Sequence, residues 1–197
     1  MSFVPLHIYT GFSYLKSALP AQKVPFLAKK YGFSKVGITD DGSLSGFAPF
    51  EKACKEAGVT PIYGMDANVE EGTFSLFVEN EAGYRNLLHL TKLSSEKKLT
   101  FAHIKERSMG LALVYTMEPR LFEERYQASS DELALKIAEY TRPFAHSYIG
   151  LPYLPHDPKI VNDIRSFSAT HSLEVVAFPK ILYEKPEDAI ALEILHA

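Results

Sequence analysis

The chain has 197 residues, of which 46% are hydrophobic and 23% are charged, a composition typical of a soluble globular domain with a sizeable core. Its net charge of −3 and its scattered lysines exclude the basic face with which a lone domain would grip nucleic-acid phosphates. The single cysteine, Cys54, excludes an internal disulfide and falls in a helical pattern where we expect it to be buried. No signal peptide or membrane-length apolar run is found, so we expect a cytoplasmic protein.

Short apolar runs alternate with helical patterns along the chain. The predicted strands are residues 3–9, 35–39, 60–65, a hairpin over 69–78, 111–115, 147–151 and 173–178. The predicted helices are residues 24–31, 47–57, 80–91, 130–141, 158 to beyond 167, and 186 to the end, with residues 10–20 and 92–98 as connectors. The alternation without a Pro-rich or Ser-rich linker predicts one α/β domain, either a barrel or a doubly wound sheet.

The run at 35–39 is the most informative strand because two carboxylates come directly after it. Val36 and Ile38 lie among small residues, which is typical of a parallel strand that is buried on both faces. Asp40 and Asp41 then fall at its carboxyl end, where α/β proteins collect their chemistry. These carboxylates can bind a cation, but capping of the next turn and helix is the favoured interpretation.

Other polar residues lie at the ends of the remaining strands, and together they form a weak metal signal. A metal cluster needs several converging imidazoles and carboxylates. The expected rim offers one histidine, three aspartates and a lysine, and the sequence contains no His-x-His pair. The rim residues are His7, Tyr9, Asp40, Asp41, Asp66, Thr116 and Lys180.

Five segments carry a family resemblance that covers nearly the whole chain. They are FVPLHIYTGFS at 3–13, GITDDG at 37–42, PIYGMD at 61–66, NEAGYRNL at 80–87 and YEKPEDA at 183–189. In this order they resemble the PHP domain (polymerase and histidinol phosphatase domain) that opens bacterial DNA polymerase III alpha subunits. The correspondence is weakest over 95–170.

The resemblance implies a distorted (β/α)7-type barrel of about seven strands, a single domain over residues 1–197, with a Zn, Mn or Mg cluster at one mouth. It also implies that the chain is the N-terminal fragment of a longer DNA-directed DNA polymerase, a nucleotidyltransferase of DNA replication. The polymerase palm would lie further along that polypeptide.

Transferring the family's metal ligands one by one shows that most are changed. His7 and Asp40 keep the family's residue type, and Asp66 replaces a glutamate with a shorter acid. Six positions carry a residue other than the family's ligand. They are Tyr9, Asp41 and Thr73 in place of histidines, Met117 in place of a cysteine, and Lys180 and Leu182 in place of a closing Asp-x-His.

With so few of the family's ligands kept, we expect a domain without bound metal and without catalytic residues. We also expect Lys180 to form a salt bridge with one of the aspartates. The resemblance implies the rest of the alpha subunit and a proofreading subunit as partners, with DNA contacted through the full polymerase. The alternative is a phosphoesterase or 3′–5′ exonuclease that uses His7, Asp40, Asp41 and Asp66 as a reduced set. A free-standing PHP-like binding protein is a third interpretation.

Overall fold

The computed structural model describes residues 3–153 and 157–190. Within these residues six strands form, namely β1 (Lys35–Asp41), β2 (Thr60–Val69), β3 (Gly72–Val78), β4 (Leu111–Thr116), β5 (Ser147–Leu151) and β6 (Val175–Ala177). The same residues form the helices α1 (Val24–Lys30), α2 (Phe47–Ala57), α3 (Glu81–Ser95), α4 (Phe101–Glu106), α5 (Pro119–Ala128), α6 (Ser130–Thr141) and α7 (Pro158–Thr170), with a 3-10 turn η1 (Pro186–Asp188). Strand neighbours keep chain order from β1 to β6, which confirms the mixed α/β class.

Contacts within the chain define two compact units. The first unit consists of residues 1–66 and 180–197, and the second consists of residues 67–179. Because β2 contains the boundary between Asp66 and Ala67, it contributes to both units.

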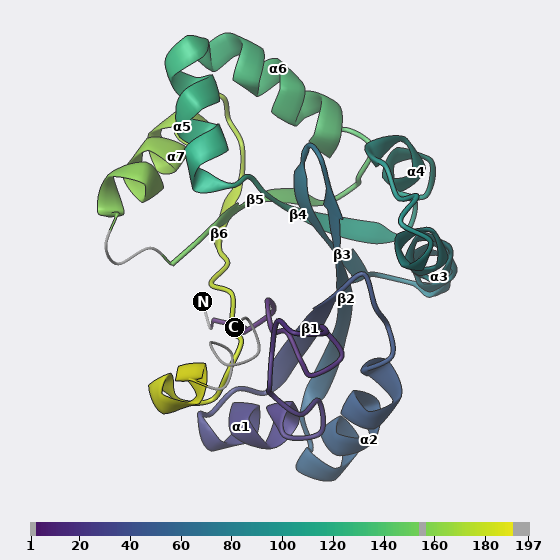
Figure 1. The fold of residues 1–197 in the computed structure, drawn as a ribbon. Coiled ribbons are helices and arrows are strands. Elements are labelled where there is room, and N and C mark those ends of the chain that lie inside the picture. Colours follow the sequence, from purple (N-terminus) through teal and green to yellow (C-terminus); the bar gives the residue numbers. More distant parts are fainter. Residues whose placement is uncertain (1–2, 154–156, 191–197) are drawn as a thin grey trace. The chain divides into compact units, whose positions relative to one another are not determined.

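In the first unit, β1 and β2 run parallel, with Lys35 opposite Thr60 and Asp41 opposite Asp66. Helices α1 and α2 pack against each other, and α1 also contacts β1 (Figure 1). The core of β1 is buried on both faces, as the sequence predicts. This register places two carboxylates at the carboxyl ends of neighbouring strands.

Residues 3–9 differ from the strand that the sequence predicts, since only Ile8 forms a β-bridge, with Ile181. The backbone still hydrogen-bonds on both sides. The Thr39 N–H donates to the Ile8 carbonyl at 3.0 Å, and the Tyr9 N–H donates to the Ile181 carbonyl at 3.0 Å. Pro5 has no N–H to donate, which shortens the ladder. The segment therefore joins β1 to the residues after Pro179 without being a regular strand.

In the second unit, β3 pairs with β4 in antiparallel fashion, and β4–β5 and β5–β6 are parallel. Helix α3 contacts β3 and β4, α7 contacts β5, and α5 packs on both α6 and α7 (Figure 1). Its core includes the ring cluster of Phe74, Phe101, Tyr115 and Tyr140. The aromatic cluster ties the β3–β4 pair to α4 and α6.

The largest errors of the sequence prediction lie in the second unit. Helices α4 and α5 are not predicted, and residues 92–95 continue α3 instead of forming a connector. Strand β6 is limited to Val175–Ala177, shorter than the predicted 173–178. The described residues contain six strands where the resemblance implies about seven, and the predicted last helix lies largely outside the described residues.

Two smaller expectations concern Cys54 and the termini of helices. Cys54 is buried, as expected, and burial raises the pKa of its thiol to about 11. The side chains of Asn80 and Asp157 accept the N-cap hydrogen bonds of α3 and α7, which begin within one residue of the predicted helix starts. Among the described residues, no helix combines the length and apolar character needed to cross a membrane.

Candidate functional site

Asp66 is the centre of a buried polar cluster in the first unit. It lies in β2 with no exposed surface, and its Oδ2 accepts hydrogen bonds from His7 Nε2 at 2.8 Å and from the Tyr9 hydroxyl at 2.7 Å. His7 and Tyr9 are two residues apart on an extended segment, so their side chains point to the same face. Both side chains are also buried. One carboxylate oxygen therefore holds the two side chains together.

Lys180 supplies the positive charge next to this cluster. Its Nζ donates to the Tyr9 hydroxyl oxygen at 3.2 Å, lies 3.9 Å from Asp66 Oδ2, and sits 4.4 Å from the centroid of the Tyr9 ring. The Ile8–Ile181 bridge holds the backbone beside Lys180 in place. The geometry confirms the predicted pairing of Lys180 with an aspartate and gives a hydrogen-bonded relay from Lys180 through Tyr9 to Asp66.

Asp40 forms a second buried cluster with the loop at residues 10–13. Its carboxylate accepts from the Thr10 N–H at 2.6 Å, the Thr10 hydroxyl at 2.7 Å and the Ser13 hydroxyl at 2.6 Å. Burial raises the pKa of Asp40 above its ordinary value, the hydrogen bonds from Ser13 and Thr10 act in the opposite direction, and the negative charge of Asp66 raises it further.

The expectation that Asp40 or Asp41 caps the helix after β1 is wrong. Helix α2 begins after Gly46 without a side-chain cap, and Asp40 instead closes the loop at residues 10–13. A Cβ at Gly46 would stand 2.8 Å from Asp40 Oδ2, which explains why a glycine is needed there. Asp41 is half-buried, forms an ion pair with Lys16, and donates its backbone N–H to Ser13 Oγ at 3.0 Å.

The remaining predicted site residues play other parts. In the second unit, the Thr73 hydroxyl donates to Asn68 Oδ1 at 2.7 Å, and Met117 is buried in an apolar cavity beside Phe122. In the first unit, Leu182 contributes a backbone carbonyl that lies 2.7 Å from the Ser17 hydroxyl.

The donor set around Asp66 does not fit a metal cluster. Within residues 3–153 and 157–190, no three or more His, Cys, Asp or Glu side chains are placed to hold an ion. A metal at Asp66 Oδ2 would bind at about 2.0–2.2 Å, and so within about 6 Å of Lys180 Nζ. At about 6 Å and an effective dielectric near 20, that ammonium opposes a divalent ion by about 5–6 kcal/mol. Lys180 is 40% exposed, so turning toward solvent lowers this repulsion.

The sequence analysis missed Thr10 and Ser13, which donate hydrogen bonds to the Asp40 carboxylate. It also missed Lys16, the cation that pairs with Asp41. The available signal was the presence of two hydroxyl residues, Thr10 and Ser13, shortly after His7 and Tyr9 in the first family-like segment. A buried aspartate needs several donors, and a neighbouring hydroxyl-rich loop is the nearest source.

Comparison with known proteins gives consistent results. The family model described as PHP domain matches residues 5–147. The chain is 28% identical to DNA polymerase III subunit alpha of Bacillus subtilis over 100% of its length and 19% of that protein. It is 26% identical to the subunit of the same name of Rickettsia bellii, over 98% of its length and 18% of that protein. The chain thus spans less than a fifth of the length of these two relatives.

A solved structure shows the same fold at low sequence identity. A proposed metal-dependent phosphoesterase from Bifidobacterium adolescentis superposes with a TM-score of 0.58 and 14% identity, over 93% of this chain and 89% of that chain. The family match covers well over half of the residues and includes the segments that carry both carboxylate clusters. The chain belongs to the PHP domain family.

Proposed function

We propose that this chain is a PHP domain without bound metal and without catalysis of its own, which serves as a structural and interaction domain of a DNA polymerase III alpha subunit. The homology to alpha subunits across the chain supports this assignment. In this proposal its main partner is the remainder of that subunit, in the cytoplasm, and DNA is contacted only through the full polymerase. A proofreading subunit is the second partner that we propose.

The observation that carries the proposal is the relay from Lys180 through Tyr9 to Asp66. The Tyr9 hydroxyl donates its hydrogen bond to Asp66, so the Tyr9 oxygen can accept a hydrogen bond from Lys180. One oxygen of Asp66 already accepts hydrogen bonds from His7 and Tyr9, and the ammonium of Lys180 lies nearby. A buried carboxylate that is compensated in this way does not require a metal ion to balance its charge.

Metal analysis and a nuclease assay on the purified chain test the proposal. The protein is incubated with Zn²⁺, Mn²⁺ or Mg²⁺ and desalted before its metal content is measured, and 3′-end trimming of single-stranded DNA is monitored with Mn²⁺ present. We expect metal content far below one ion per chain and no trimming. Near-stoichiometric metal together with trimming that Asp66→Asn abolishes would establish the reduced-set exonuclease instead.

A gain-of-ligand variant makes the test sharper. Tyr9→His combined with Lys180→Asp restores two ligand types of the family and removes the ammonium. We expect this variant to retain more metal than the wild type under the same protocol, because repulsion is replaced by attraction. Equal retention in both proteins would show that Lys180 and Tyr9 do not control metal binding.

A further inference from the structure

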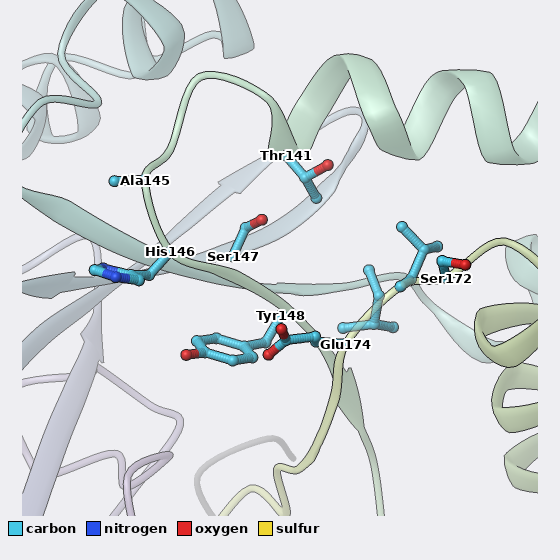
Figure 2. A pocket seen from close by; sticks show the side chains of 9 residues that line it. Thr141, Ala145, His146, Ser147, Tyr148, Ser172 and Glu174 are labelled. Atoms are coloured by element: carbon cyan, nitrogen blue, oxygen red, sulfur yellow. The ribbon is translucent and has the colours of Figure 1, made fainter.

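We propose that a cavity in the second unit binds a guanidinium group carried on an alkyl chain. The cavity has a volume of about 280 Å³ and opens at the amino-terminal ends of β5 and β6, with the end of α6 beside it (Figure 2). Its polar lining includes Thr141, His146, Ser147, Tyr148, Ser172 and Glu174. The proposal does not depend on the metal-free function proposed above.

Strand register brings an aromatic ring and a carboxylate together in this cavity. Ile149 pairs with Val175 in the parallel β5–β6 ladder, so the residues just before them, Tyr148 and Glu174, are neighbours on one face. The Ile149 N–H donates to the Glu174 carbonyl at 2.8 Å, which fixes this end of the pairing. Figure 2 shows both side chains among the lining residues. An aromatic face next to a carboxylate suits an organic cation.

The charge of the cavity is not balanced by the protein. Glu174 is an exposed residue whose carboxylate makes no ion pair or hydrogen bond with any described residue, and neither lysine nor arginine lines the cavity. His146, at the rim, is hydrogen-bonded through Nδ1 to a second carboxylate, Glu79. Arg142, the C-cap residue of α6, is exposed and is not part of the lining.

Two helices end beside this cavity, and both lack a basic residue in the last turn. They are α6, which ends at Thr141, and α7, which ends two residues before Ser172. Each of the other α-helices in the described part of the chain has a lysine, arginine or histidine in its last turn. A helix carboxyl end has partial negative charge, but α6 and α7 end at the C-cap residues Arg142 and His171, so we assign the attraction for a cation to Glu174 and not to the helix ends.

Guanidinium is the cation that best matches these groups. It is planar, presents several N–H donors, is weakly hydrated, and stacks on aromatic rings. The Thr141 hydroxyl donates to the Ile137 carbonyl at 2.9 Å, so its oxygen is free to accept, and the serine hydroxyls also offer oxygens. A metal ion would need several carboxylate or imidazole ligands, whereas this lining holds one of each. The volume is just below that of drug-sized pockets and suits one side chain or a small molecule.

Titration of the full chain with capped arginine amide, monitored by NMR chemical shifts or calorimetry, tests the proposal. N-methylguanidinium is the second probe, and urea is the neutral planar control. We expect both cations to bind in the millimolar range, as is usual for ligands with few atoms, and urea not to bind. Tighter binding of capped arginine identifies a partner's side chain as the source, and equal binding identifies a free guanidinium compound.

Two variants assign the effect to the cavity. Glu174→Gln should weaken binding of both cations about tenfold, since it removes a charged acceptor. Glu106→Gln changes an exposed carboxylate at the end of α4 and should leave binding unchanged. Unfolding midpoints of both variants check that the fold is intact. No saturable binding to the wild type, equal binding of urea, or full binding by a folded Glu174→Gln protein would overturn the proposal.

Discussion

Two buried aspartates on neighbouring parallel strands have their negative charges compensated by different kinds of groups. Asp66 on β2 is compensated by an imidazole, a phenol and a nearby ammonium. Asp40 on β1 is compensated by one backbone N–H and two hydroxyl groups, with no cation bonded to it among the described residues. The first arrangement uses charge, and the second uses neutral dipoles.

The two clusters also differ in where their donors come from. Around Asp66, the side chains of Tyr9 and Lys180 take part in the cluster directly and stabilise the carboxylate. Around Asp40 the donors belong to the loop at residues 10–13, and the carboxylate stabilises that loop. Asp66 should therefore depend on Lys180, whereas Asp40 should depend on pH through its own raised pKa.

The largest effect is expected for Asp66→Asn, which removes the negative charge that His7, Tyr9 and Lys180 surround. Removing one partner of a buried, hydrogen-bonded charge cluster destabilises a protein by about 3–5 kcal/mol. We expect a loss in the free energy of unfolding near the lower value, measured by urea denaturation. Asp163→Asn on α7 is the control and should change it by less than about 0.5 kcal/mol. A loss as small as the control's would mean that the charge of Asp66 is unimportant.

Asp40→Asn should cost about 1–3 kcal/mol at neutral pH, because an amide cannot accept from all three donors. The wild type should also show a pH dependence that the variant lacks. With its pKa raised above 3.8 in the folded protein, Asp40 binds its proton more tightly when folded. Its contribution to stability is therefore present below pH 3.8 and is lost as the pH rises through the folded pKa.

Urea unfolding of both proteins at several pH values, from about 3 to 7, measures that difference. Subtracting the variant's curve removes the contributions of the other carboxylates. A difference that grows in favour of the wild type as the pH rises from 4 would contradict the raised pKa and would make Asp40 resemble an ion-paired carboxylate.

Lys180→Ala should lower the free energy of unfolding by about 1–2 kcal/mol. Asp66 then loses its nearby cation, but Lys180 is 40% exposed and water screens part of the interaction. Lys105→Ala, which removes an exposed lysine at the end of α4, is the matched control. A more stable Lys180→Ala protein would refute the pairing of Lys180 with Asp66.

Much of the fold could be predicted from local pattern. Strand β1 was predicted from Val36 and Ile38 between small residues, and the start of α3 was predicted within one residue of the observed Glu81. Helix α4 was missed because its local signal is weak, and α5 was missed although Pro119 in its first turn is a signal of a helix start. Helix α4 spans only Phe101–Glu106, and α5 buries only Phe122. Their stability comes from tertiary packing, which a single sequence does not display.

The candidate site was predictable as a set of positions but not as a set of partners. Of the nine positions that the family resemblance indicated, His7, Tyr9, Asp40, Asp66 and Lys180 come together in the first unit, whereas Thr73 and Met117 belong to the second. Which aspartate pairs with Lys180 depends on the β1–β2 register and on the Ile8–Ile181 bridge, contacts between residues far apart in sequence. Side-chain spacing along the chain carries no information about those pairings.

The smallest effect is expected for Tyr9→Phe, which keeps the ring beneath Lys180 and removes only the hydroxyl. Asp66 loses one hydrogen bond and Lys180 loses its acceptor, so we expect about 1 kcal/mol of destabilisation. A double-mutant cycle with Lys180→Ala separates the relay from simple additivity. If the relay is real, the double variant is less destabilised than the sum of the single variants, because each change breaks the same hydrogen bond. If the two effects add within error, Lys180 acts on Asp66 through space, and Tyr9 serves only as its second hydrogen-bond donor.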